Sequence, residues 1–464
     1  MDALAAIISF IPVAALIVAL TVFKFAAWRA ALIALATGAA EALWWRGLPA
    51  GELAACAAKG AQTGLYPIGL VIVAALFTYA ITVESKAIDE IKRALASLSS
   101  EKCYLALLIA WGFGNFMEGM AGFGTAVAIP CAILVGIGFD PMKAVLCCLV
   151  ANTTPTAFGS VGVPTMVLAS ETGLEVSRLT ATIAYLELVP TALSPFIILA
   201  IVEGRQGLKA HWRLALLADV AFLVPWLAIA ATFSCELPNI IGGIVTMVAI
   251  GAIGDCKEID VRAQAWAWMP FAFVVALLSV AALMPAHVKP SPGLVILIAA
   301  FLGGLCQKIR PARLFGLLFE TLRRYALALF TICAVLALAK IMGAAGMTDL
   351  LAKALVAATG RYYAAVSPVI GALAGFVTGS GTSSNVLFGS LQTSVAASEA
   401  HRFLFAAANV MGAGIGKMIC PQSIVLGCAA AGLAGQENAV MSKAAKFLAA
   451  VLFAAALATF AAAF

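Results

Sequence analysis

Four short stretches rich in Gly, Ser, Thr and Asn interrupt long apolar runs, and they hold most of the residues that could do chemistry. The stretch Thr378–Asn385 reads TGSGTSSN, in which six of eight residues are Ser, Thr or Asn and the other two are Gly. Hydroxyl groups, amide groups and the free N–H groups of a helix start can hold a carboxylate and a neighbouring hydroxyl. The stretch therefore predicts the tip of a re-entrant hairpin or a broken helix that binds a small anion. A polar loop at the membrane surface is the alternative.

Proline and glycine make a continuous helix improbable in the stretch ANTTPTAFGSVGVP, which begins at Ala151. Pro155, Gly159, Gly162 and Pro164 fall within ten residues there, and a proline inside a helix removes a backbone donor and clashes with the preceding turn. Non-helical backbone at membrane depth must be buried in protein or line a wet cavity. We therefore expect half-helices whose N-termini point toward an anion.

Asn152 and Asn409 occupy equivalent places in two similar stretches. In ANTTPTAFGSVGVP, and in ANVMGAGIGKMICP beginning at Ala408, the Asn precedes a Gly by seven positions and a Pro by twelve. An Asn ahead of a helix break can cap a half-helix or contact a ligand. The sequence leaves both roles open.

Three charged side chains lie inside apolar or interrupted stretches. Glu118 is a candidate proton carrier, or else forms a structural hydrogen bond or lies near the surface of a hairpin. Lys417 could pair with a substrate carboxylate or with Glu118, or could extend to the membrane interface. Glu187 is a secondary candidate for ion coupling, with a scaffold hydrogen bond as the alternative.

The predicted site combines residues from both halves of the chain. The residues predicted to bind substrate are Gly122, Gly124, Thr125, Asn152, Thr153, Thr154, Ser380, Thr382, Ser383, Ser384, Asn385, Asn409, Lys417, Gln422 and Ser423, and those predicted to couple a proton are Glu118 and Glu187. No metal ion and no cofactor is expected.

Composition indicates the class of protein that must position these residues. Of the 464 residues, 64% are hydrophobic and 11% are charged, and the mean hydropathy is +1.07. A soluble chain of this length would need far more charge to cover its surface. Counting apolar runs against the length of a helical span gives roughly 12 to 16 full or half membrane segments. The runs are continuous and rich in Ala and Leu, so we expect an all-α polytopic membrane protein and no β-barrel.

Basic residues in short loops predict the topology. The stretches Glu84–Lys102, Glu203–Arg213 and Gln307–Arg324 are rich in Lys and Arg, and such loops stay on the cytoplasmic side. Together with Lys24 and Arg29, this places the N-terminus outside.

The order of the motifs predicts two inverted repeats. The run Gly69–Val83 precedes a basic loop, whereas Tyr325–Lys340 follows one, so the two runs cross the membrane in opposite directions. Related interrupted motifs follow each run in the same order, and inverted repeats are common in secondary transporters with alternating access. The predicted divisions are N-terminal helices 1–59, repeat 60–174, intervening helices 175–320, repeat 321–433 and a C-terminal helix 434–464.

Other classes of function find no support in the motifs. The chain has no GxxxxGK[ST], GxSxG or HExxH pattern, so neither an ATP-driven pump nor an enzyme is expected. The 11 cysteines lie mostly in apolar runs, without CxxC spacing or an associated histidine, and are predicted to be packing residues. The net charge of +6 lies in loops and predicts no nucleic-acid partner. The first apolar run lacks a basic segment before it and is expected to be a true span, not a leader.

The same four stretches resemble the bacterial lactate permease family. In matching order and spacing, the resemblance is carried by EGMAGFGTAVAI (Glu118–Ile129), NTTPTAFGSVGVP (Asn152–Pro164), TGSGTSSNVLFGSLQ (Thr378–Gln392) and GKMICPQSIVLGCAA (Gly416–Ala430). It implies import of L-lactate, and often of D-lactate or glycolate, with a proton. It also implies elevator-like movement of the motif-bearing hairpins against a scaffold. Members of the family are longer, with a larger middle region than Glu175–Glu320.

These observations predict a secondary transporter of the bacterial cytoplasmic (inner) membrane that moves a 2-hydroxy monocarboxylate with a proton. The expected partners are the carboxylate, the proton and the lipid bilayer, and a homodimer is left open. A sodium-coupled dicarboxylate carrier is an alternative, although two carboxylates would want more fixed positive charge than Lys417 alone. A channel and an integral-membrane enzyme are the remaining alternatives.

Overall fold

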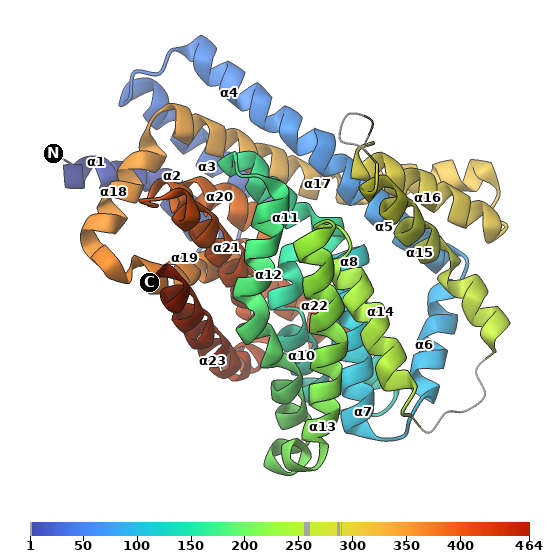
Figure 1. Cartoon of the computed structure of the whole chain (residues 1–464). Coiled ribbons are helices and arrows are strands. Elements are labelled where there is room, and N and C mark those ends of the chain that lie inside the picture. The colour runs from blue at the N-terminus through green and yellow to red at the C-terminus, as the bar shows by residue number, and fades with distance from the viewer. Residues whose placement is uncertain (1, 255–259, 285–287, 289) are drawn as a thin grey trace.

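The computed structural model describes residues 2–254, 260–284, 288 and 290–464. Over this part of the chain all regular structure is helical (Figure 1), which confirms the predicted all-α class. Within these described residues, five helices are long and apolar enough to cross a membrane, as a polytopic membrane protein requires. They are Ala50–Glu84, Val176–Thr232, Val261–Ala282, Pro311–Ala344 and Glu437–Ala463.

Two further helix pairs reach the length of a span only when taken together across a bend. Pro141–Ala151 and Pro155–Thr172 meet at 65°, and Glu399–Ile419 and Pro421–Ala431 meet at 44°. Shorter apolar helices add partial spans, namely Ile11–Leu20, Thr125–Gly136, Pro238–Gly251 and Pro292–Cys306. The total of 12 to 16 full or half segments stays a prediction.

The N-terminal helices pack against a long helix from the second half of the chain. The helices here are α1 (Asp2–Ser9), α2 (Ile11–Thr21), α3 (Ala27–Trp44), α4 (Ala50–Thr63), the π-helical turn η1 (Gly64–Gly69), α5 (Leu70–Glu84) and α6 (Ala87–Ser97), with α17 (Pro311–Ala344) from later in the chain. α3 and α4 pack along α17, and α4 and α17 run beside each other along one edge of the molecule (Figure 1). Gly60 permits this approach, because a Cβ there would lie 2.6 Å from the backbone of Ala337.

The segment 60–174, predicted to be the first repeat, contains two interruptions in its later part. Its later helices are α7 (Lys102–Ala106), η2 (Leu107–Phe113), α8 (Gly114–Met120), α9 (Thr125–Gly136), α10 (Pro141–Ala151), the 3-10 turn η3 (Thr154–Phe158) and α11 (Gly159–Thr172). One break lies between α8 and α9, and the other between α10 and α11. In the second, Ser160, Val161 and Gly162 all have positive φ, so the expected loss of a continuous helix is confirmed.

The segment 321–433, predicted to be the second repeat, is also interrupted twice. Its helices after α17 are α18 (Met347–Thr359), η4 (Gly360–Tyr362), α19 (Tyr363–Thr378), α20 (Gly381–Ser394), α21 (Glu399–Gly416), η5 (Lys417–Ile419) and α22 (Pro421–Ala431). The breaks fall between α19 and α20 and between α21 and α22. Pro421 begins α22 at the first helical position, where the missing N–H of proline does no harm.

The intervening and C-terminal helices surround the interrupted segments. They are α12 (Val176–Ala192), α13 (Ser194–Thr232), α14 (Pro238–Gly251), α15 (Val261–Ala282), α16 (Pro292–Cys306) and α23 (Glu437–Ala463). α14 packs against α8 and α13, and α23 packs against α19 and α21. The broken helices are thus enclosed by protein, as non-helical backbone in a membrane requires.

Side-chain contacts link the basic stretches predicted to be cytoplasmic. Arg313 Nε lies 2.8 Å from Glu84 Oε1, and His211 Nε2 lies 3.0 Å from Glu101 Oε1. The stretch that begins at residue 84 thus contacts the stretches that begin at residues 203 and 307, while their side of the membrane stays a prediction.

Candidate functional site

A cavity of about 180 Å³ lies where the four helix breaks come together. Its wall includes Gly124 after the α8–α9 break, Asn152 after α10, Ser380 before α20 and Lys417 after α21. Pockets for drug-sized ligands are about 300–1,000 Å³, so this smaller cavity suits a ligand of a few heavy atoms.

A buried ion pair lies in the wall of this cavity. Lys417 Nζ lies 3.2 Å from Glu118 Oε1 and donates a hydrogen bond of 3.0 Å to Thr156 Oγ1. Asn152 Nδ2 donates to the other carboxylate oxygen of Glu118 at 2.8 Å. The side chains of Lys417 and Glu118 are only 10% and 4% exposed. Each charge thus has an opposite charge and a further hydrogen-bond partner, which is what a buried ion pair needs.

Small residues make room for this pair. A Cβ on Gly159 would lie 2.6 Å from Glu118 Oε1, so any larger residue would displace the carboxylate. A Cβ on Gly122 would lie 2.1 Å from Ser160 Oγ, and that hydroxyl donates to Ala121 O at 3.1 Å. The glycines of these two motifs therefore let the α8–α9 break and the start of α11 touch.

The start of the bent segment after α10 is held by the intervening helices. Asn239 of α14 donates from Nδ2 to Pro155 O at 2.5 Å, and Trp226 of α13 donates to Asn239 Oδ1 at 2.9 Å. Thr156, next to Pro155, donates from its hydroxyl to Asn152 O at 3.1 Å. This fixes the hydroxyl that accepts the Lys417 hydrogen bond.

Two helix N-termini also meet at the cavity. Ser380 is the N-cap of α20, and its Oγ accepts a hydrogen bond from Ser383 N at 3.2 Å. Gln422 and Ser423 belong to the first turn of α22 and line the same cavity. The N-terminus of a helix carries partial positive charge, so both helices favour an anion at this place.

Nine of the predicted residues line the cavity together. They are Glu118, Gly124, Asn152, Ser380, Thr382, Ser383, Lys417, Gln422 and Ser423.

The other predicted residues lie elsewhere. Thr125 lines a neighbouring cavity of about 430 Å³ that shares Phe123, Gly124 and Leu426 with the first. Gly122 and Thr153 support the breaks from behind: Gly122 faces Ser160, and the Thr153 hydroxyl donates to Val150 O at 2.8 Å.

Three more predicted residues lie off the cavity wall, namely Ser384, Asn385 and Asn409. Ser384 donates from its hydroxyl to Ser380 O at 2.8 Å. The side chain of Thr154 lies outside the described part of the structure.

Asn385 and Asn409 belong to a separate hydrogen-bonded chain. Asn385 Nδ2 donates to Pro164 O at 2.9 Å, and Asn409 Nδ2 donates to Asn385 Oδ1 at 2.9 Å. Gln392 donates from Nε2 to Asn409 Oδ1 at 3.4 Å, and its Oε1 accepts from the Ser367 hydroxyl at 2.8 Å. Asn409 thus lies in the interior of α21, where it ties α20 and α21 together. Asn152, at the end of α10, is the residue that reaches the cavity.

Sequence reasoning missed Thr156 and Ser160 as cavity residues. Both are small hydroxyl residues inside the motif that was singled out, so the signal was present. Their roles depend on the turn after α10, which the sequence did not define.

Glu187 is buried in α12 and lines neither polar cavity. Its two carboxylate oxygens, and the hydroxyls of Thr191 and Ser194 farther along, have no hydrogen-bond partner within the described residues. A larger cavity of about 810 Å³ lies between α6, α14 and α15, but its wall is almost wholly apolar and offers nothing to hold a carboxylate.

Comparison with known proteins places this arrangement in a family. A family profile described as L-lactate permease matches residues 5–290 and 278–464. The L-lactate permease of Streptococcus iniae is 35% identical over 84% of this chain and 90% of its own length. This chain belongs to the L-lactate permease family.

Two further relatives are named for different substrates. The L-lactate permease of Escherichia coli (strain K12) is 31% identical over 94% of this chain and 91% of its own length. Glycolate permease GlcA of the same strain is 32% identical over the same shares of the two chains. The four motifs that carried the resemblance thus pointed to the correct family.

Proposed function

We propose that this protein is a secondary transporter that carries lactate, and related 2-hydroxy monocarboxylates such as glycolate, across the bacterial cytoplasmic membrane together with a proton. Its membership of the L-lactate permease family supports the substrate class. The buried Lys417–Glu118 pair in the small cavity is the observation that carries the mechanism.

The cavity offers a 2-hydroxy acid one group for each of its polar functions. The Lys417 ammonium and the N-terminus of α20 would hold the carboxylate. The hydroxyls of Thr382, Ser383 or Ser423 could then donate to or accept from the substrate hydroxyl. A dicarboxylate would find a single lysine in this wall, which favours a monocarboxylate.

Charge balance explains why a proton should accompany the anion. Without substrate, Lys417 and Glu118 neutralise each other. A bound monocarboxylate would add one negative charge to a buried site, and uncompensated buried charge is costly. Protonation of Glu118 removes its charge and frees Lys417 for the substrate. The anion and the proton then stabilise each other in the cavity.

Alternating access would follow from the two interrupted repeats. Each half of the chain contributes two helix breaks, and all four breaks meet at the cavity. They are the α8–α9 and α10–α11 breaks of the first half and the α19–α20 and α21–α22 breaks of the second. We propose that the halves are related by an inverted repeat, and that the α8–α11 and α19–α22 segments move as a unit against α4 and α17. Movement of these two segments would carry the cavity from one side of the membrane to the other.

Glu187 is a second candidate for the proton path. It is buried without a hydrogen-bond partner in the described residues, where an uncompensated charge would be costly. Glu187→Gln is isosteric and should keep lactate binding intact. Retention of full proton-driven uptake by this variant would remove Glu187 from the coupling path.

Uptake by purified protein in proteoliposomes tests the function. Labelled lactate should accumulate when the outside is acid and no sodium is present, and a protonophore should abolish the accumulation. Empty liposomes serve as the control. Absence of uptake above that control would refute transport of lactate, whereas uptake that requires a sodium gradient and ignores the pH gradient would refute proton coupling.

A further inference from the structure

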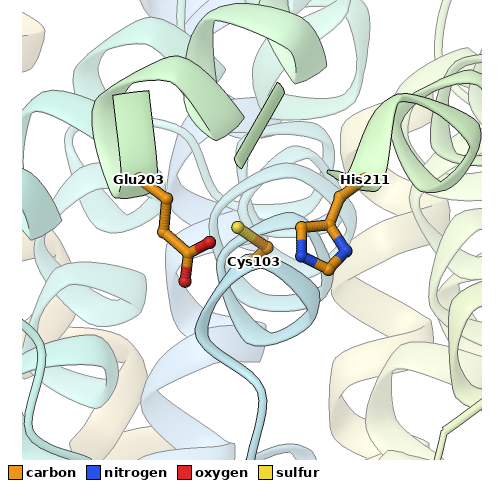
Figure 2. A group of neighbouring side chains, drawn as sticks. All are labelled: Cys103, Glu203 and His211. Carbon is orange, nitrogen blue, oxygen red and sulfur yellow. The ribbon is translucent and has the colours of Figure 1, made fainter. Parts of the chain in front are cut away.

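Cys103, Glu203 and His211 form a group of potential metal ligands away from the substrate cavity. One ligand atom from each residue lies within 4.8 Å of the others. Figure 2 shows the Cys103 sulfur between the Glu203 carboxylate and the His211 ring. Cys103 belongs to α7, and the other two belong to α13, neither of which lines the cavity that holds Lys417.

The backbone of α13 explains how residues 108 positions apart come together. Gly204 (φ 66°, ψ −148°) and His211 (φ −117°, ψ 16°) depart from helical geometry, so the chain bends at both and brings Glu203 and His211 to the start of α7. Buried Gly207 lies within this bend, and a Cβ there would lie 2.6 Å from Glu203 Cβ. The sequence suggested no histidine beside a cysteine, because this pairing depends on the bend.

We propose that Cys103, Glu203 and His211 bind a divalent ion of the zinc class. Zinc favours thiolate, imidazole and carboxylate ligands in a tetrahedral shell, with a water or a further side chain in the fourth position. The thiolate of cysteine is a soft ligand and the imidazole of histidine a borderline one, whereas Mg²⁺ and Ca²⁺ are hard cations that prefer oxygen ligands. The ligand set therefore disfavours Mg²⁺ and Ca²⁺. On binding, the Cys103 thiol releases its proton to solvent, and the thiolate and the neutral imidazole each donate an electron pair to the metal.

The metal-free contacts already hold the donors in place. The Cys103 sulfur lies within 4.8 Å of a Glu203 carboxylate oxygen, and His211 Nε2 lies 3.0 Å from Glu101 Oε1. Ligand bonds of about 2.0–2.3 Å require the three donors to draw together slightly. The exposed Glu203 and the 27%-exposed His211 side chain can make that adjustment, while Cys103 is fully buried and fixed.

Neighbouring charges suit a dication with anionic ligands. Glu101 can complete the shell or stay hydrogen-bonded to the imidazole, as outer-shell carboxylates do at zinc sites. Lys143 Nζ donates to Val202 O at 2.6 Å, next to Glu203 in the chain. Its positive charge offsets the excess negative charge of a thiolate and two carboxylates around one metal ion. The ion would tie the start of α7 to the bend of α13.

Cobalt substitution gives a direct test, because a thiolate bound to Co²⁺ produces a charge-transfer absorption band that carboxylates and imidazole alone do not. Metal-free full-length protein in detergent is titrated with Co²⁺ and then with Zn²⁺. We expect the band to grow to saturation at a single ion per chain and to disappear when Zn²⁺ displaces Co²⁺. Absence of the band in the wild-type protein would overturn the proposal.

Single substitutions assign the ligands. Cys103→Ser should remove the band, and His211→Ala or Glu203→Gln should weaken binding by more than tenfold. Glu101→Gln should weaken it by roughly 10–100-fold if Glu101 only positions the imidazole. Cys306→Ser removes an exposed cysteine outside the group and should leave the band unchanged. A band that survives in Cys103→Ser would overturn the assignment, and size-exclusion profiles establish that each variant is folded.

Discussion

At the scale of single residues, the Lys417–Glu118 pair has a structural role and a proposed role in transport. The two charges are almost fully buried and compensate each other. In the proposed mechanism, protonation of Glu118 leaves the Lys417 ammonium for the substrate carboxylate. Removing one member of a buried pair typically costs about 3–5 kcal/mol, because the other charge is left without compensation. Structural and transport roles can therefore be separated by replacing the two residues singly and together.

Glu118→Gln should abolish proton-driven uptake of lactate and leave lactate binding and lactate exchange in place. Glutamine imitates the protonated carboxyl, so Lys417 is free for substrate at every pH, but no proton can be carried. The measurements are uptake under an imposed pH gradient and exchange in proteoliposomes without a gradient. Glu52→Gln, on the exposed face of α4, is the matched control. Unchanged proton-driven uptake in Glu118→Gln would exclude this carboxyl from the mechanism.

Lys417→Met should abolish lactate binding and destabilise the protein by about 3–5 kcal/mol, since Glu118 would be buried without its partner. The double variant Lys417→Met with Glu118→Gln should recover most of the stability, because neither charge remains, yet still fail to bind lactate. Thermal unfolding in detergent and lactate-induced shifts of the melting temperature report the two properties. Binding of lactate by the double variant would show that Lys417 does not hold the carboxylate.

At the scale of elements, glycines bring α19 and α21 into backbone contact. A Cβ on Gly375 would lie 2.0 Å from Ala413 O, and one on Gly412 would lie 2.0 Å from Pro368 O. Gly371 and Gly416 make similar approaches, so both helices carry glycines four residues apart on the shared face. Small residues of this kind allow close packing of helices in membranes, where no hydrophobic force drives them together. This contact sets the position of the α21–α22 bend, and hence of Lys417.

Gly412→Ala should destabilise the protein by about 1–3 kcal/mol, as overpacking does, and should lower transport because the bend shifts. Gly343→Ala is the matched control, since this glycine lies inside α17 and an added Cβ meets nothing within 4 Å. Alanine favours a helix over glycine, so the control should be neutral or slightly more stable. Melting temperatures of the two variants decide the matter: equal values would show that the α19–α21 contact tolerates a methyl group.

At the scale of the whole molecule, the proposed movement of the hairpins against α4 and α17 must break specific contacts. Lys340 of α17 lies 3.0 Å from Glu171 of α11. By contrast, Ser390 of α20 donates from its hydroxyl to Glu171 O at 3.1 Å, a contact inside the unit proposed to move. The two contacts share Glu171, so they form a matched pair for testing which parts of the molecule move together.

Crosslinking should distinguish movement from a static site. With Cys306 replaced, the pair Glu171→Cys and Lys340→Cys is joined by a short bifunctional thiol reagent that a reductant can cleave. Lactate exchange should fall on crosslinking and return on reduction. The pair Glu171→Cys and Ser390→Cys should tolerate the same treatment. Full exchange by the crosslinked first pair would argue against movement of α11 relative to α17.

The sequence by itself determined the class of the protein, its family and the location of the helix breaks. Mean hydropathy and continuous apolar runs specify membrane helices, because the bilayer admits little else. Pro and Gly act through local backbone geometry, so breaks near Pro155, Gly162, Gly379 and Pro421 could be read from the chain alone. Single buried charges such as Glu118 and Lys417 are also conspicuous in an apolar sequence.

Only the tertiary structure decided which of these residues act together. Glu118 and Lys417 are 299 positions apart, and their contact depends on how two separate halves pack. Asn152 and Asn409 occupy equivalent places in the sequence, but Asn152 reaches the cavity from the end of α10 whereas Asn409 lies in the interior of α21. The group of Cys103, Glu203 and His211 likewise exists only because α13 bends at Gly204 and His211. Residue type and spacing fix local geometry, whereas distances between remote side chains are fixed by packing alone.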